Sequence, residues 1–259
     1  MSDPVRTWSR QAALAERWTM VLPARRGTPP SPPAEGNDFA ADAEDIAELI
    51  DAPTHVVAHS YGCIGTLLAV AKRPGLVATL TLVEPPAYQL LASDAEALRA
   101  MEAFEELRRV ASPEEFLPAF LQAFLGAPAQ RIPLDPSMRR LVELTMRERP
   151  PWTAELPLFT LRDAGTPILI VSGGHARLFE ACADALAEEL APHAVRAVIR
   201  GAGHAVQRLG EPFNAALERF WREARIEEPR QGPICHPPAW AVNLAVVERA
   251  IRRRPGTCP

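Results

Sequence analysis

The stretch that most constrains the fold of this chain is residues 55–65, which pattern as a short apolar strand, a tight turn and the start of a helix. Ser60 lies at the turn, with Ala58 two positions before it and Gly62 two positions after it. This small-x-Ser-x-small setting is typical of a nucleophile elbow, where a strained turn exposes the serine hydroxyl at the edge of a sheet. We expect the flanking residues to be small because larger ones would collide. The following helix would point its first N–H groups toward developing negative charge.

Strand and helix patterns alternate on both sides of a long helical stretch. This alternation predicts an α/β fold with a doubly wound, mostly parallel sheet that helices cover on both faces. Residues 88–164 have helical patterns only, which predicts an all-helical cap inserted into the core. The predicted strands are residues 19–23, 55–59, 77–83, 167–172 and 195–199. The predicted domains are residues 1–87 and 165–225 for the core, 88–164 for the cap and 226–259 for an accessory tail.

Composition excludes several classes of partner. The net charge of −4 favours neither nucleic acid nor an anionic membrane surface. No basic-then-apolar leader and no apolar run of membrane-spanning length is visible, so a cytoplasmic protein with a small-molecule substrate is expected. The sequence does not predict an oligomeric state. Residues 240–254 could form an amphipathic helix with a basic end, for which membrane or partner binding is the minor alternative.

No cofactor or metal is predicted. The chain has no C-x-x-C pair, so a thiolate zinc site is unsupported. His55 and His59 are four residues apart, but on a strand and its turn they are more typical of a core-edge residue and an elbow residue than of metal ligands.

His204 is the candidate base for Ser60. It follows a predicted strand in the segment Gly-Ala-Gly-His at 201–204 and precedes the final predicted helix. This places it at the carboxyl end of a strand, where ligands bind in doubly wound sheets. A serine hydroxyl needs such a base to accept its proton, and a carboxylate to orient that base. The alternative is an ordinary surface-loop histidine.

Three segments resemble the α/β-hydrolase superfamily, and the resemblance covers about residues 8–225. They are Ala-His-Ser-Tyr-Gly at 58–62, Leu-Val-Glu-Pro-Pro at 82–86, and Gly-Ala-Gly-His-Ala-Val-Gln-Arg at 201–208. The resemblance implies the chain order nucleophile, acid, histidine, with Ser60 as nucleophile and His204 as base. It also implies that the N–H of Tyr61 stabilises the oxyanion. The family includes esterases, lipases, lactonases, C–C hydrolases, dehalogenases and cofactor-free haloperoxidases.

The position of the acid departs from the family's common pattern. That pattern places an Asp soon after the strand that follows the cap, but here no carboxylate precedes Glu180. We expect Glu180 to lie about two turns into a helix, away from the site. Glu84 follows the strand after the nucleophile, where some family members place the acid, and it is the preferred candidate. The alternative is that Glu84 caps nearby N–H groups or pairs with an Arg.

Two further histidines are candidate pocket residues. His175 occupies the turn that the acid vacates, and His59 directly precedes the nucleophile. We expect both to line the substrate pocket, although an ordinary polar loop residue is an equally good interpretation of His175.

The front of the chain also departs from the family. Its members have a strand ending in His-Gly before the first helix, and the loop after it supplies a second oxyanion N–H. No such segment precedes Trp8. We expect a gap in the sheet between residues 19–23 and 55–59. Loss of one oxyanion donor typically lowers the rate by about 10²–10³. The favoured explanation is a start codon further upstream, and the alternative is a truncated form with poor activity.

The sequence therefore predicts a serine hydrolase that cleaves an ester-like bond, a carboxylic ester or lactone, of a small and largely apolar substrate through an acyl-enzyme. Aromatic residues of the cap would either line an apolar pocket or pack among themselves; they are Phe104, Phe116, Phe120, Phe124 and Trp152. The alternatives are a C–C bond hydrolase, a cofactor-free perhydrolase of the haloperoxidase type, or an inactive hydrolase fold that binds a ligand.

Overall fold

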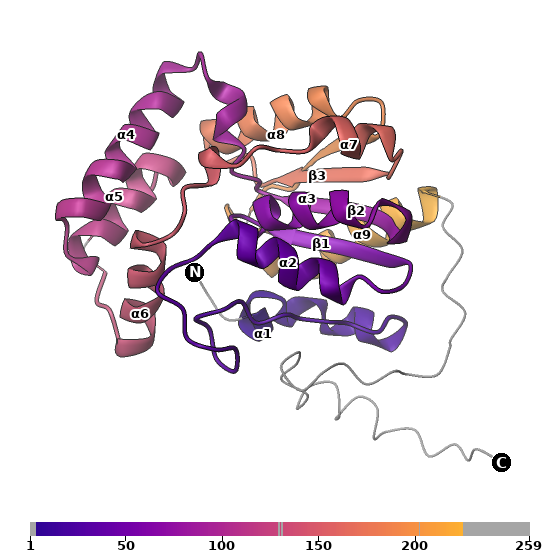
Figure 1. The fold of residues 1–259 in the computed structure, drawn as a ribbon, viewed down its shortest axis with the longest axis horizontal. Coiled ribbons are helices and arrows are strands. Elements are labelled where there is room, and N and C mark those ends of the chain that lie inside the picture. The colour runs from indigo at the N-terminus through magenta and orange to yellow at the C-terminus, as the bar shows by residue number, and fades with distance from the viewer. Residues whose placement is uncertain (1–3, 129, 131, 202, 225–259) are drawn as a thin grey trace.

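A four-stranded parallel sheet forms the centre of the molecule (Figure 1). The computed structural model describes residues 4–128, 130, 132–201 and 203–224. The strand order is β1-β2-β3-β4, and the register pairs Val57 with Thr81 and Thr81 with Leu169. The predicted α/β class with a parallel sheet is confirmed. The strands are β1 (Thr54–His59), β2 (Val77–Val83), β3 (Ile168–Ser172) and β4 (Ala194–Val198).

Both faces of the sheet are covered, because alternate residues of each strand point to opposite sides. Leu82 and Ile170 belong to the core shared with α3 (Gly62–Lys72) and α8 (Arg177–Glu189). Val83 and Val171 pack on the other side, against the 3-10 helix η1 (Ser9–Glu16) and against α9 (Glu211–Glu223). Every β2 residue except Ala78 is buried, as expected for an interior parallel strand.

Helix α2 (Phe39–Leu49) packs tightly on α3. Asp38 caps its first turn by accepting a hydrogen bond from the Ala40 N–H. The close approach depends on Gly65, where an added Cβ would lie 2.9 Å from the Cβ of Asp42. The helix that begins at the elbow is therefore held in place by a second helix.

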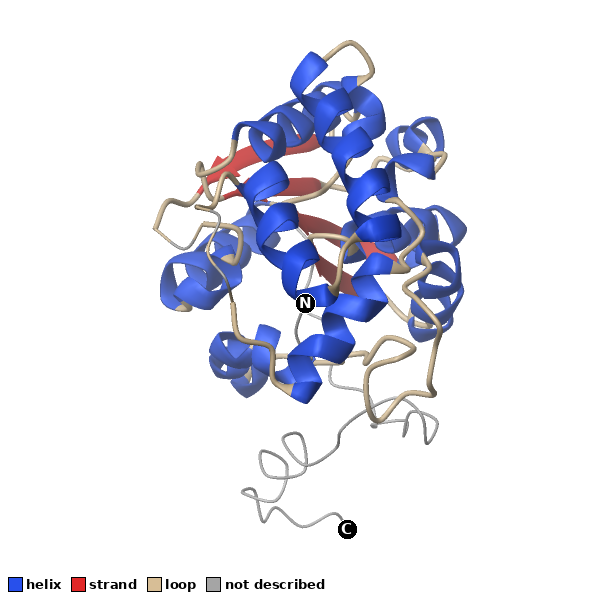
Figure 2. Cartoon of the chain, turned by 90° about the vertical axis from the view of Figure 1, so that its left-hand side faces the viewer, coloured by secondary structure: helices blue, strands red, loops and turns tan. Residues whose placement is uncertain are grey.

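All the described elements between β2 and β3 are helical, and α4, α5 and α6 form a layer beyond one end of the strands (Figure 1; from the side, Figure 2). Asp94 caps the first of these helices, and Ser112 with Glu115 forms a capping box at the second. Phe104 and Phe116 are almost fully buried where α4 and α5 meet. The elements are η3 (Tyr88–Leu91), α4 (Ala95–Val110), α5 (Pro113–Leu125), α6 (Pro136–Met146), η4 (Pro151–Thr153) and α7 (Leu158–Asp163). The remaining short helices are α1 (Pro4–Thr7), η2 (Pro74–Leu76) and η5 (Val206–Leu209).

The prediction of a buried strand at residues 19–23 was wrong. This segment has no strand assignment, and Val21 is 47% exposed. The physical reason is the lack of a partner: among the described residues β1 pairs only with β2, so its outer edge is open. A cavity of ≈ 2210 Å³ is lined both by residues 18–26 and by all six residues of β1.

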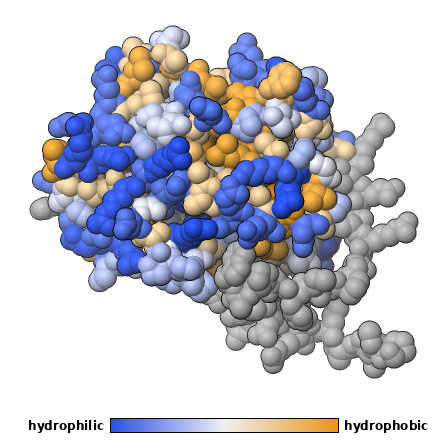
Figure 3. All heavy atoms as spheres, in the orientation of Figure 1, coloured by the Kyte–Doolittle hydropathy of each residue, from blue (hydrophilic) through white to orange (hydrophobic). Residues whose placement is uncertain are grey.

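The polarity of the surface outside this cavity is ordinary. The face seen in Figure 3 has mostly hydrophilic side chains with smaller apolar areas between them. Within the part of the chain that the structure describes, no helix is both long and apolar enough to cross a bilayer. The helix predicted at residues 240–254, and the accessory tail that contains it, lie outside the described residues.

Candidate active site

Ser60 lies between β1 and α3 in a left-handed backbone conformation, with φ of 54°. Few non-glycine residues adopt this conformation, and it is typical of strained turns at functional sites. The Ser60 N–H donates to the Val83 carbonyl at 2.8 Å, which ties the turn to the end of β2. The collision expected at position 62 is absent, because a Cβ added to Gly62 would have no heavy atom within 4 Å.

The His204 ring lies directly against Ser60. Its Nε2 is 2.9 Å from the Ser60 Oγ, although the two residues are 144 positions apart in the sequence. On the other side of the ring, Nδ1 is 3.2 Å from Oε2 of Glu84. The three side chains form one continuous hydrogen-bonded line, the arrangement that lets an imidazole accept a serine proton while a carboxylate orients it.

Glu84 follows β2 directly and shares the unusual backbone of Ser60, with φ of 54°. Its side chain is fully buried. The Gly173 N–H donates to Oε1 at 2.6 Å, which leaves Oε2 for His204. Glu84 therefore does accept a backbone N–H, as the alternative interpretation required, but it uses its other oxygen to orient the histidine.

The loop that bears His204 is fixed from two sides. The His59 ring donates from Nε2 to the His204 carbonyl at 2.8 Å, so His59 supports the loop as well as lining the cavity. Gly173 lies against the same loop so closely that an added Cβ would be 2.2 Å from the Gly203 carbonyl oxygen. Only glycine permits this contact.

Burial shifts the pKa values of the acid and the base toward their neutral forms. Burial raises the pKa of Glu84 to about 7, against the opposing effect of the Gly173 N–H. Burial also lowers the pKa of His204 to about 3, and His175 acts in the same direction. His204 is therefore neutral across the physiological range, and Glu84 becomes ionised as the pH rises through about 7.

Tyr61 follows Ser60 and lies just before the first turn of α3. Among the described residues no backbone carbonyl accepts its N–H, so this donor remains available for an oxyanion. Its hydroxyl is directed elsewhere and donates to the Arg149 carbonyl at 2.8 Å. The ring lies under the Arg25 guanidinium, which pairs with Asp42.

The prediction that Glu180 lies two turns into the helix and away from the site was wrong. Glu180 is in the first turn of α8, and its side chain folds back to accept hydrogen bonds from the Ser172 hydroxyl and the Gly174 N–H. Arg196 pairs with the same carboxylate. Glu180 thus holds the turn that supplies Gly173 to Glu84. A Gly-Gly pair after a strand was the only signal of this support in the sequence.

His175 lies beside Glu84, with Nδ1 3.7 Å from Oε1. It is not among the residues that line the cavity, whereas His59, Ser60 and Tyr61 are.

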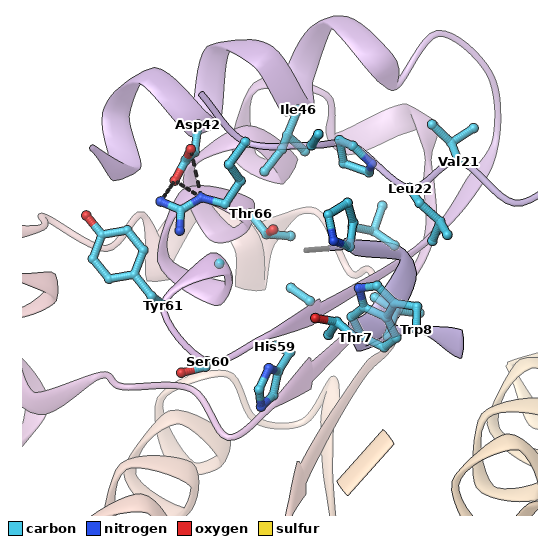
Figure 4. Close-up of a pocket in the computed structure, with 18 of the residues that line it drawn as sticks. Thr7, Trp8, Val21, Leu22, Asp42, Ile46, His59, Ser60, Tyr61 and Thr66 are labelled. Atoms are coloured by element: carbon cyan, nitrogen blue, oxygen red, sulfur yellow. Dashed lines mark hydrogen bonds and ion pairs between the residues drawn. The ribbon is translucent and has the colours of Figure 1, made fainter. Parts of the chain in front are cut away.

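The cavity extends from Ser60 toward the cap and along the outer edge of β1. Figure 4 shows Ser60 and Tyr61 toward one end and Val21 and Leu22 toward the other. The cap contributes aromatic lining residues, which are Tyr88, Phe104, Phe120, Phe124 and Trp152. Phe116 is not among them and packs against Phe104 and Phe120 instead. The aromatic side chains of the cap therefore do both things that were expected as alternatives: some line the cavity, and some pack against one another.

Comparison with solved structures shows the same fold. A thermophilic esterase from Thermogutta terrifontis superposes with a TM-score of 0.58 at 20% identity, over 86% of this chain and 87% of that chain. A structure from a study of carboxylesterases of Nitrososphaera gargenis gives a TM-score of 0.57 at 14% identity, over 86% and 87% of the two chains.

Sequence comparison gives a curated relative and a family. The relative is the 2-(acetamidomethylene)succinate hydrolase of Mesorhizobium japonicum, 31% identical over an alignment of 219 residues, with 74% of this chain and 74% of the relative covered. The model of the alpha/beta hydrolase family matches residues 3–248, nearly the whole sequence. On this match, together with the fold, the chain belongs to the α/β-hydrolase family.

Proposed function

We propose that this chain is a serine hydrolase that cleaves a carboxylic ester or lactone of a small, largely apolar substrate. The observation that supports this most directly is the line of hydrogen bonds from Ser60 through His204 to Glu84, at 2.9 Å and 3.2 Å. Burying a carboxylate costs stability that its hydrogen bonds only offset, and buried titratable groups of this kind are concentrated at functional sites.

In the proposed mechanism, Ser60 attacks the ester carbonyl while His204 accepts its proton at Nε2. Glu84 accepts the Nδ1–H of the ring and stabilises the imidazolium that forms. The Tyr61 N–H stabilises the oxyanion. His204 then protonates the leaving alcohol. In the second half of the reaction, His204 accepts a proton from a water molecule that attacks the acyl-enzyme, and it returns a proton to Ser60 as the acyl group is released.

The lining of the cavity favours an uncharged substrate. Three arginines line it, and each already pairs with a carboxylate: Arg17 with Glu218, Arg25 with Asp42 and Arg26 with Asp45. The aromatic side chains of the cap supply apolar surface in the cavity that Ser60 also lines. A substrate with carboxylates, such as the succinate named for the curated relative, would have to compete with these internal ion pairs.

A fluorophosphonate probe tests whether Ser60 is activated. We expect the probe to label Ser60 of the full chain, as located by peptide mass spectrometry, and the Ser60→Ala variant to remain unlabelled. Ser9→Ala, at an exposed position, is the matched control and should label like the wild type. A folded wild-type protein that is not labelled would favour an inactive fold that binds a ligand.

Substrate profiling separates the enzyme alternatives once labelling is seen. We expect turnover of p-nitrophenyl esters, faster for butyrate than for acetate because the longer acyl chain reaches the apolar cap. The same protein is then assayed with a β-diketone and, in a separate reaction, with hydrogen peroxide and acetate. Faster turnover of the β-diketone would identify a C–C bond hydrolase, and faster peracid formation a perhydrolase.

A further inference from the structure

Three side chains that can bind a metal converge on the side of His204 away from Ser60. Glu84, His175 and His204 each place one ligand atom within 4.8 Å of the other two. Nδ1 of His204 is 3.2 Å from Glu84 Oε2, and Nδ1 of His175 is 3.7 Å from Oε1. Two histidines and one carboxylate are a common protein ligand set for zinc.

The separations suit a tetrahedral ion. With zinc bonds of about 2.0–2.1 Å, the ligand atoms of a tetrahedral site lie roughly 3.4 Å apart. Nδ1 of His204 and Oε2 of Glu84, 3.2 Å apart, lie close to this separation. Because Gly173 already holds Oε1, Oε2 is the oxygen available to the ion. The His175 side chain is 21% exposed, so this ligand is in contact with solvent.

We infer that Glu84, His175 and His204 form a Zn²⁺ site that switches the hydrolase off by changing the tautomer of His204. This inference rests on the proposed function for its effect on activity, but the binding of the metal does not depend on it. Zinc takes the Nδ1 lone pair of the neutral ring, so the single ring proton moves from Nδ1 to Nε2. A protonated Nε2 donates to Ser60 Oγ and cannot accept its proton, which removes the general base.

Metal binding is measured on Ser60→Ala, which lacks the nucleophile and keeps all three ligands. Cys235, His236 and Cys258 could also bind zinc, so every protein in the experiment carries Cys235→Ser, His236→Gln and Cys258→Ser. We expect one Zn²⁺ per chain by calorimetry, and a Co²⁺ absorption spectrum of tetrahedral intensity. His175→Gln should weaken binding by about tenfold or more, whereas the control His193→Gln should bind like its parent.

Activity is measured on the same proteins with Ser60 restored. Zn²⁺ should inhibit reversibly, with full recovery after addition of EDTA, and His175→Gln should need at least about tenfold more Zn²⁺ for half-inhibition, in line with its weaker binding. The proposal fails if Ser60→Ala binds no zinc, or if His175→Gln and its parent bind and respond alike. Zinc binding through His175 in a protein that no fluorophosphonate labels would contradict the proposed function while leaving the metal site standing.

Discussion

The two sides of Ser60 differ in how completely they are built. On the side of His204, the ends of β2 and β3 present Glu84 and Gly173, and every group in the line has a partner within hydrogen-bonding distance. On the other side, the outer edge of β1 borders a cavity of ≈ 2210 Å³. Residues 19–23, which also line this cavity, pair with no strand within the described residues. The His204 side of Ser60 is organised by neighbouring strands, whereas its β1 side borders an open edge.

This difference shows which part of the chemistry depends on sheet pairing. Strands that pair on both sides fix their carboxyl ends relative to one another, and therefore the residues that follow them. Ser60 directly follows β1, which pairs on one side only among the described strands, so its position depends on its hydrogen bond to Val83 and on the packing of α2 against α3. We expect substitutions on the two sides to have unequal effects.

The largest effect is expected at Glu84. Glu84→Gln keeps the shape of the side chain but removes the charge that selects the productive tautomer of His204, and kcat should fall by about 10⁴. Steady-state ester hydrolysis measures this, with the exposed Glu223→Gln as the matched control. A loss of less than tenfold would mean that Glu84 has a structural role and that another group orients the histidine.

The same truncation on an inner strand and on the open strand should differ in cost. Val171 is fully buried in β3, whereas Val57 lines the cavity in β1. We expect Val171→Ala to lower the free energy of unfolding by about 2–3 kcal/mol, and Val57→Ala by about 1 kcal/mol or less. Urea titration of both variants measures the difference. Equal losses would show that the outer edge of β1 is packed as firmly as the interior of the sheet.

The smallest effect is the pH dependence of the intact site. The raised pKa of Glu84, about 7, means that the carboxylate is lost as the pH falls through that value. The protonated acid no longer carries the charge that stabilises the imidazolium of His204, so kcat/KM should drop about tenfold between pH 8 and pH 6. A rate profile over this range measures it. A flat profile would show that Glu84 stays ionised throughout, which would require a pKa near that of an exposed carboxyl.

Part of the arrangement on the His204 side of Ser60 could be predicted from local pattern. The strand, turn and helix around Ser60 and the position of His204 after a strand depend on residues close in sequence. Glu84 was the preferred acid because of the resemblance to the α/β-hydrolase superfamily, some members of which place the acid after the strand that follows the nucleophile. Glu180 was misjudged because α8 begins only at Arg177, which puts Glu180 in its first turn, where its side chain reaches back to Ser172 and Gly174. Arg196, 16 positions away on β4, pairs with the same carboxylate.

The sequence by itself determined the alternation of strands and helices, the sharp turn at Ser60 and the chain order of the candidate residues. These follow from side-chain periodicity and from the conformations that small residues permit. Only the tertiary structure decided that residues 19–23 form no strand, that His59 supports the His204 loop, and that His175 lies beside Glu84. Each of these depends on contacts between segments far apart in the chain, and such contacts exist only once the sheet has assembled.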